Sequence, residues 1–137
     1  MLLAVYNIIY TMKLRCTENS IRLRVRKSDL HTLVQEGLVR EVVNLPGSVF
    51  FSFELITAEV DHPKAGFQDN CLRVTLPKAQ SDQWINSDQV GIEHLEPLVN
   101  GHQLHILIEK DFPCKDREDE DKTDTFQELV QENGEKC

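Results

Sequence analysis

Alternation of apolar and polar residues is the feature that most constrains the fold of this chain. Apolar side chains recur at every second position in the stretches 21–25, 51–55, 72–76 and 104–108, and the residues between them are mostly polar. Successive side chains of a β-strand point to opposite faces, so a period of two indicates strands with one face toward a core. The sequence therefore predicts a fold built mainly from half-buried strands.

Two short helices are expected between these strands. The first is predicted to start at Ser28, a favoured N-cap residue, and to end at Gly37, because glycine readily adopts the left-handed conformation that closes helices. The second follows Pro77 and carries Trp84, the only tryptophan, which is expected in the core. The predicted fold class is α+β, with a mostly antiparallel, barrel-like sheet and two short helices.

The second half of the chain repeats the pattern of the first at a spacing of 51 residues. The same order of strand, short helix and strand appears in both halves. This order indicates an internal βαβ duplication with a pseudo-twofold axis, and a coincidence of two ordinary βαβ-like stretches is the alternative. The shift aligns four identical pairs: Asn19 with Asn70, Arg22 with Arg73, Lys27 with Lys78, and Val39 with Val90.

The 137 residues suit one domain, and both ends differ from the middle. Residues 111–137 carry 4 basic and 10 acidic side chains, so most of the net charge of −8 belongs to the end of the chain. Residues 1–11 are apolar but too few to span a bilayer. We expect an N-terminal extension or extra edge strand at 1–11, one α+β domain at 12–112, and an acidic, partly disordered tail at 113–137.

Signatures of known chemistry are missing from the sequence, so no cofactor is indicated. It has no glycine-rich phosphate loop, no zinc-protease motif, no nucleophile elbow and no pair of cysteines at C-x-x-C spacing. His102 and His105, three apart on a predicted strand, face opposite sides and cannot share one metal from there. The acidic balance argues against a nucleic-acid partner, and we expect a cytoplasmic protein with reduced thiols and no membrane segment.

Three arginines make the most distinctive pattern among the polar residues. Arg22, Arg24 and Arg26 alternate with apolar residues and are predicted to share one strand face. Guanidinium groups placed in this way can bind phosphate or carboxylate through paired hydrogen bonds. Glu54 and Glu109 occupy polar positions of two other predicted strands. They either hold a divalent metal beside an anion bound by the arginines, or pair with the arginines in structural salt bridges.

Cys114 is a candidate reactive thiol. It follows a predicted strand end, and Lys110 and Lys115 lie close in sequence. Nearby positive charge lowers the pKa of a cysteine and increases its thiolate fraction. A passive cysteine at the same place is the alternative interpretation.

Three segments, Asn19–Arg24, Ser87–Glu93 and Leu107–Cys114, resemble a family of short, uncharacterised bacterial proteins, a domain of unknown function. The resemblance covers residues 12 to 126 and implies no activity.

The sequence favours a small binding or accessory protein whose cationic strand face meets a small anion or a protein partner. Two alternatives rest on further resemblances. Glutamates and arginines on inward-facing strands resemble the tunnel enzymes that act on triphosphates, which implies a metal-dependent phosphate-handling enzyme. The segment Val74–Lys78 followed by Ser87–Val90 resembles the swapped-hairpin DNA-binding regulators, with Ser87 where those proteins have glycine.

Overall fold

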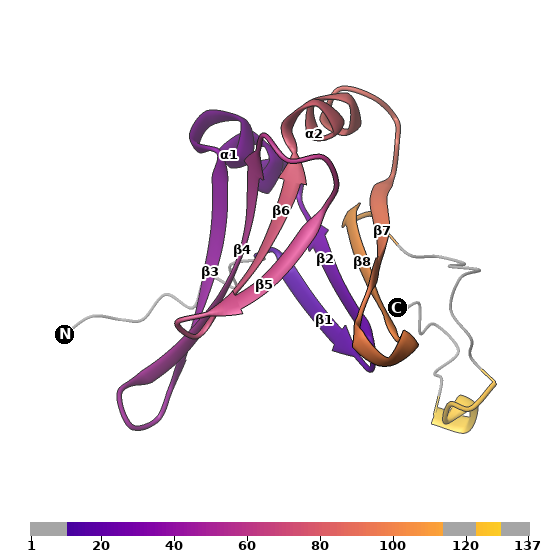
Figure 1. The fold of residues 1–137 in the computed structure, drawn as a ribbon. Helices are drawn as coiled ribbons and strands as arrows, with labels where there is room; N and C mark the ends of the chain where they lie inside the picture. Colours follow the sequence, from indigo (N-terminus) through magenta and orange to yellow (C-terminus); the bar gives the residue numbers. More distant parts are fainter. Residues whose placement is uncertain (1–10, 114–122, 130–137) are drawn as a thin grey trace.

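Eight strands and two α-helices make up the chain in the computed structural model, which describes residues 11–113 and 123–129 (Figure 1). Two single-turn helices, η1 (Val99–Gly101) and η2 (Gln127–Leu129), complete the described part. The main elements in chain order are β1 (Lys13–Thr17), β2 (Ser20–Val25), α1 (Lys27–Glu36), β3 (Leu38–Leu45), β4 (Val49–Ala58), β5 (Lys64–Gln68), β6 (Cys71–Pro77), α2 (Lys78–Ile85), β7 (Gly91–Pro97) and β8 (Gln103–Lys110).

The strands form two separate four-stranded sheets. The first sheet has the order β1-β2-β8-β7, and the second has the order β3-β4-β6-β5. Four of the six pairings between described strands are antiparallel, whereas β2–β8 and β4–β6 are parallel. The α+β class with mostly antiparallel pairing and two helices is therefore confirmed. The barrel-like curl is not confirmed, because the described strands form two sheets and no closed barrel.

The second half of the chain repeats the element order of the first. Hairpin, helix and hairpin follow one another twice, so that β1, β2, β3 and β4 correspond to β5, β6, β7 and β8. The strand registers match at a spacing of 51 before the helix and 53 after it. Because helix and loop together are two residues longer in the second half, Val39 corresponds to Ile92, and its predicted alignment with Val90 is wrong.

One hydrophobic core joins both sheets and both helices. The helices lie at the same end of the two sheets (Figure 1). Trp84 is fully buried, as predicted, and its indole N–H donates a hydrogen bond of 3.1 Å to the carbonyl of Val90. The buried cluster comprises Met12, Leu23, Val25, Leu33, Val39, Phe53, Leu55, Val74, Leu76, Trp84, Ile92, Ile106 and Ile108.

The ends of α1 show one correct prediction and one error. Gly37 has φ 75° and its N–H donates to the carbonyl of Leu33, which confirms it as the helix stop. The predicted N-cap at Ser28 is wrong, because the helix starts at Lys27 with Arg26 in the cap position. The Arg26 backbone N–H donates to Asp29 Oδ2 at 2.7 Å, so a carboxylate in the first turn satisfies this group.

The predicted domain ends lie close to the limits of the described residues. Met12, at the expected start of the domain, is buried in the core. Most of the expected extension at 1–11 and most of the expected tail at 113–137 lie outside the described residues, and these boundaries stay predictions. In the described part of the chain, none of the helices has the length and apolar character needed to cross a membrane.

Candidate functional site

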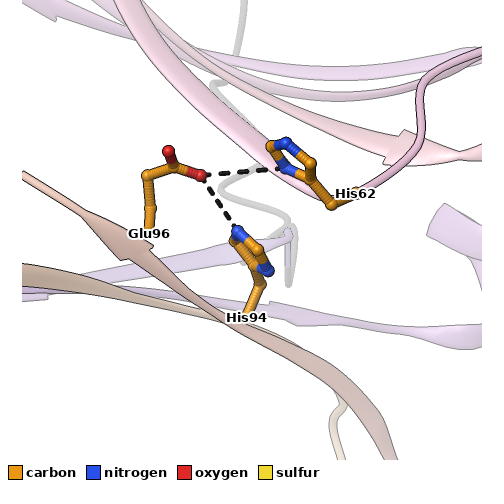
Figure 2. A group of neighbouring side chains, drawn as sticks. All are labelled: His62, His94 and Glu96. Atoms are coloured by element: carbon orange, nitrogen blue, oxygen red, sulfur yellow. Dashed lines mark hydrogen bonds and ion pairs between the residues drawn. The ribbon is translucent and has the colours of Figure 1, made fainter.

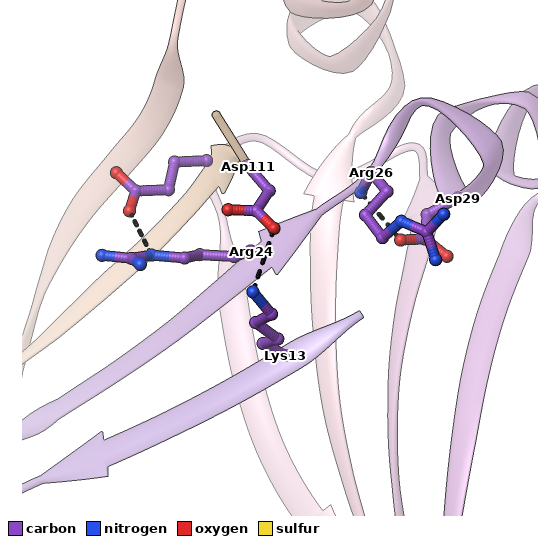
Figure 3. A network of polar contacts seen from close by, with 6 residues as sticks. Lys13, Arg24, Arg26, Asp29 and Asp111 are labelled. Atoms are coloured by element: carbon purple, nitrogen blue, oxygen red, sulfur yellow. Dashed lines mark hydrogen bonds and ion pairs between the residues drawn. The ribbon is translucent and has the colours of Figure 1, made fainter. Parts of the chain in front are cut away.

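The outer face of each sheet, meaning the face opposite the core, carries a glutamate held by two arginines. On the first sheet, Arg24 Nε donates to Glu109 Oε1 at 3.0 Å, and Arg22 Nε lies 3.2 Å from the same oxygen. Figure 3 shows Arg24 making this contact across the parallel β2–β8 pairing. The side chains of Arg22 and Arg24 are only 16% and 13% exposed. These two arginines therefore make the structural ion pairs that the sequence left as one of its alternatives.

The basic residues of β1 lie beside those of β2. Lys13 pairs in register with Arg24, and Arg15 pairs with Arg22. Lys13 Nζ reaches Asp111 Oδ2 at 3.2 Å (Figure 3). Carboxylates at the end of β8 therefore partly balance the cationic strands.

Arg26 does not belong to this face. Strand β2 ends at Val25, and Arg26 lies at the start of α1 beside Asp29 (Figure 3). The predicted three-arginine anion site therefore has two arginines on one strand face and the third at a helix start. Anion binding by Arg22, Arg24 and Arg26 stays a prediction.

The second sheet presents its own arrangement around Glu54. Arg40, Glu54 and Arg73 stand directly opposite one another on β3, β4 and β6. Arg40 donates to Glu54 Oε2 through Nε at 2.8 Å and lies 2.7 Å away through Nη2, and Arg73 Nε donates to Oε1. The glutamate is completely buried, whereas the side chains of Arg40 and Arg73 are 48% and 55% exposed.

The charge state of Glu54 follows from two opposing effects. Burial penalises its carboxylate and by itself would raise the pKa. Hydrogen bonds from Arg73 and Arg40, together with their charges, more than offset burial and hold the pKa of Glu54 below its ordinary value. The same hydrogen bond and charge raise the pKa of Arg73. The three groups therefore form a stable, ionised row across the sheet.

Glu54 and Glu109, the predicted metal ligands, lie on strands of different sheets. Each is engaged by arginines of its own sheet. None of these contacts brings the two carboxylates together, and the predicted metal site stays a prediction. Their alternative role, pairing with arginines, is the one the contacts show.

A cavity of about 530 Å³ opens over the outer face of the second sheet. The exposed parts of Arg40 and Arg73 border it, and the exposed aromatic side chains of Phe50 and Phe67 lie around it. Gly66 faces Arg73 across the β5–β6 pairing, and a Cβ at this glycine would meet nothing within 4 Å. The remaining lining residues are Ser52, Gln68, Asp69 and Cys71.

A second group of polar side chains lies between the two sheets. His62 comes from the loop before β5, and His94 and Glu96 come from β7 (Figure 2). His94 Nε2 is 2.9 Å from Glu96 Oε1, and His62 Nδ1 is 3.7 Å from the same oxygen. Alternation on one strand could have placed His94 beside Glu96, but nothing in the sequence locates His62 next to them.

Cys114, the predicted reactive thiol, lies outside the described residues and stays a prediction. Cys71 is the cysteine that lines the cavity of the second sheet. It is a half-buried free thiol. No sequence pattern distinguishes Cys71 from the other cysteines, because its place at the cavity follows from strand pairing.

One family model matches most of the chain. It is described as a family of unknown function (DUF7009), and the match covers residues 12–129. This range agrees with the resemblance found from the sequence segments. No curated protein and no solved structure matches the chain.

Proposed function

The chain belongs to a family of unknown function (DUF7009), and from the geometry of its site we propose that it is a binding protein for a small organic anion. The ligand would sit in the cavity on the outer face of the second sheet, with its carboxylate or phosphate group on Arg40 and Arg73. An apolar or aromatic body would lie against Phe50 and Phe67.

The observation that carries this proposal is the exposure of two arginines above a buried glutamate. A guanidinium group has five N–H donors. The contacts with Glu54 use Nε of both arginines and Nη2 of Arg40, and about half of each side chain faces solvent. Glu54 therefore fixes both guanidinium groups in place while leaving donors for a ligand, which reduces the ordering cost of binding.

The charges around the cavity favour a ligand with both anionic and donor groups. Glu54 pairs with Arg40 and Arg73 inside the sheet, and Asp69, in the turn between β5 and β6, also lines the cavity. Asp69 can accept a hydrogen bond from a hydroxyl or amine of the ligand. Contact with Phe50 and Phe67 would add apolar stabilisation. A bare inorganic anion, which lacks this contact, is expected to bind more weakly.

The cationic face of the first sheet supports the same function less well. Arg22 and Arg24 are mostly covered and share the carboxylate of Glu109.

The two alternative functions are less well supported. A phosphate-handling enzyme with Glu54 as a metal ligand would have to break two arginine contacts to a buried carboxylate. DNA binding needs basic side chains in excess over carboxylates, whereas this chain carries 15 basic and 23 acidic side chains.

Thermal unfolding with phenyl phosphate and inorganic phosphate tests the proposal. A ligand that binds only the folded state raises the melting temperature. We expect a rise with phenyl phosphate, a smaller rise with inorganic phosphate, and neither in Arg73→Gln. Lys64→Gln is the matched control, because Lys64 is an exposed cation on the neighbouring strand β5 and does not line the cavity.

Phe67→Ala tests the contribution of the aromatic part of the ligand separately from that of its anionic group. Phe67 is exposed, so its loss should leave the fold intact. Phe67→Ala should reduce the rise in melting temperature with phenyl phosphate to the rise seen with inorganic phosphate. Equal shifts in wild type and Arg73→Gln would contradict the proposed site.

Two further expectations from the sequence belong to this proposal. We propose that the two halves arose by duplication, which the matching strand registers support. We also propose a reducing, cytoplasmic environment, which is consistent with free thiols at Cys16 and Cys71.

A further inference from the structure

We propose that His62, His94 and Glu96 form a binding site for a divalent transition metal of the zinc class. The inference is independent of the anion cavity, because it uses other residues in another part of the fold.

The alternation of β7 places two of the ligands. Ile92 is buried in the core, and His94 and Glu96 follow it at steps of two, so all three lie on the core-facing side of the strand. The loop between β4 and β5 brings His62 to the same place (Figure 2). The rings of His62 and His94 stack with centroids 4.7 Å apart and an interplanar angle of 13°. The ligand set therefore joins a loop of the second sheet to the edge of the first.

The distances suit a single ion. Glu96 Oε1 lies 2.9 Å from His94 Nε2 and 3.7 Å from His62 Nδ1, and one ligand atom from each residue lies within 4.8 Å of the others. In a tetrahedral zinc site with bonds of about 2.0–2.2 Å, ligand atoms are about 3.3 Å apart. Small side-chain rotations therefore suffice to close the site, and all three residues are half-buried.

The donor types select the class of metal. Two imidazoles and one carboxylate suit Zn²⁺, Cu²⁺ or Ni²⁺, whereas Mg²⁺ and Ca²⁺ prefer oxygen ligands. Asp61 Oδ1 lies 3.6 Å from Nε2 of His62. Nδ1 of the same ring lies 2.9 Å from the carbonyl of Pro63, so a metal at Nδ1 would replace this hydrogen bond. A small movement would let Asp61 accept a hydrogen bond from Nε2, as carboxylates commonly do around metal-ligating histidines. Three protein ligands leave a fourth position for water or a small ligand.

The other half of the chain carries different side chains at the corresponding places. The strand registers make Thr11, Glu41 and Val43 the counterparts of His62, His94 and Glu96. At that place the backbone N–H of Met12 donates to Glu41 Oε2 at 3.3 Å. The segment before the first strand therefore meets the edge strand without any imidazole, so the two histidines are a property of the second half alone.

Calorimetric titration of the full, metal-free chain with Zn²⁺ tests the site. We expect one zinc to bind per chain at this cluster and its affinity to fall by more than about tenfold in His94→Ala. His105→Ala is the matched control, because His105 also pairs with a glutamate, with Nε2 2.8 Å from Glu93 Oε2, but does not belong to the group of three metal-ligating side chains found among the described residues. The control should bind zinc as wild type does.

His62→Gln and Glu96→Gln keep the test decisive if His94→Ala unfolds the chain. Melting temperatures in a chelator identify which variants fold. In folded variants, zinc at micromolar concentration should raise the melting temperature of wild type and His105→Ala by several degrees, and should leave the cluster variants unchanged. Mg²⁺ should have no such effect. Equal zinc affinity in wild type and in folded cluster variants, or no zinc binding by wild type, would overturn the proposal.

Discussion

At Glu54 a carboxylate is removed from water and lies between two guanidinium groups. Burying such a charge costs several kcal/mol unless it is paired and hydrogen-bonded. Arg40 and Arg73 supply these hydrogen bonds from the strands on either side. The same contacts hold both arginines at the border of the cavity, so one buried residue links sheet stability to the proposed binding site.

The pH dependence of stability should report the Glu54 contacts. Its pKa in the folded chain is lowered, although burial alone would raise it, because hydrogen bonds and charges of Arg73 and Arg40 dominate. Stability from this group is therefore present above the unfolded pKa of about 4.3 and is lost as the pH falls through the lower, folded pKa. Glu54→Gln should flatten the acid side of the stability curve, measured by urea unfolding with Trp84 fluorescence.

Glu41 should affect the pH dependence of stability in the opposite direction, because its pKa in the folded chain is raised. Burial raises its pKa against the hydrogen bond from Met12, and the charge of Asp29 adds to the rise. The folded chain therefore binds a proton at Glu41 more readily than the unfolded chain, which adds stability as the pH falls. Glu41→Gln should make the acid loss steeper. A change of the same sign in both variants would show that one of the two pKa assignments is wrong.

At the level of elements, the start of α1 depends on Asp29 and not on Ser28. Asp29 accepts a hydrogen bond from the backbone of Arg26, whereas Ser28 lies inside the first turn. Asp29→Ala should lower the free energy of unfolding by about 1 kcal/mol, as expected for loss of a helix cap. Ser28→Ala should change it by less than about 0.5 kcal/mol. Urea unfolding of both variants measures the difference, and the reverse order would contradict this account of the helix start.

Local patterns predicted the elements well because their causes are local. Alternation over 21–25 and 72–76 predicted β2 and β6, and Gly37 predicted the end of α1 through its own backbone conformation. The parallel pairings of β2 with β8 and of β4 with β6 join strands that are distant in sequence, and alternation does not encode such partners. The sequence therefore predicts one sheet where the structure has two.

The candidate sites show the same difference between local patterns and long-range pairing. The sequence singled out Arg22, Arg24 and Glu109, which the structure brings together. It did not rank Arg40 or Arg73 as ligand-binding residues, because their exposure depends on neighbours across the sheet. The sequence does not predict the histidine cluster, because His62 comes from the loop between β4 and β5, whereas His94 and Glu96 come from β7 of the other sheet.

At the scale of the whole molecule, the two halves depend on each other. Each sheet contains one hairpin from each half, and both parallel pairings join the halves. A half alone would leave one edge of each hairpin unpaired and would expose its part of the core. The described strands and helices should therefore unfold as one cooperative unit.

The predicted domain limits can be tested with shortened chains. We expect a chain of residues 12–112 to unfold cooperatively with a stability within about 1 kcal/mol of the full chain, because the core residues lie inside it. Met12→Ala in that chain should cost about 2–5 kcal/mol, since this side chain is buried. Urea unfolding measures both. Failure of 12–112 to unfold cooperatively would show that the ends belong to the fold.

Anion binding by Arg40 and Arg73 can be measured directly by calorimetric titration of phenyl phosphate into wild type, Glu54→Gln and Arg73→Gln. In wild type an anionic ligand shares Arg40 and Arg73 with the carboxylate of Glu54. Because this carboxylate holds both guanidinium groups in place, and a glutamine amide cannot accept hydrogen bonds from both, Glu54→Gln should weaken binding by about tenfold, or about 1.4 kcal/mol. We expect weaker binding in Glu54→Gln and loss of binding in Arg73→Gln. Wild-type affinity in Glu54→Gln, or binding that survives in Arg73→Gln, would overturn the proposed site.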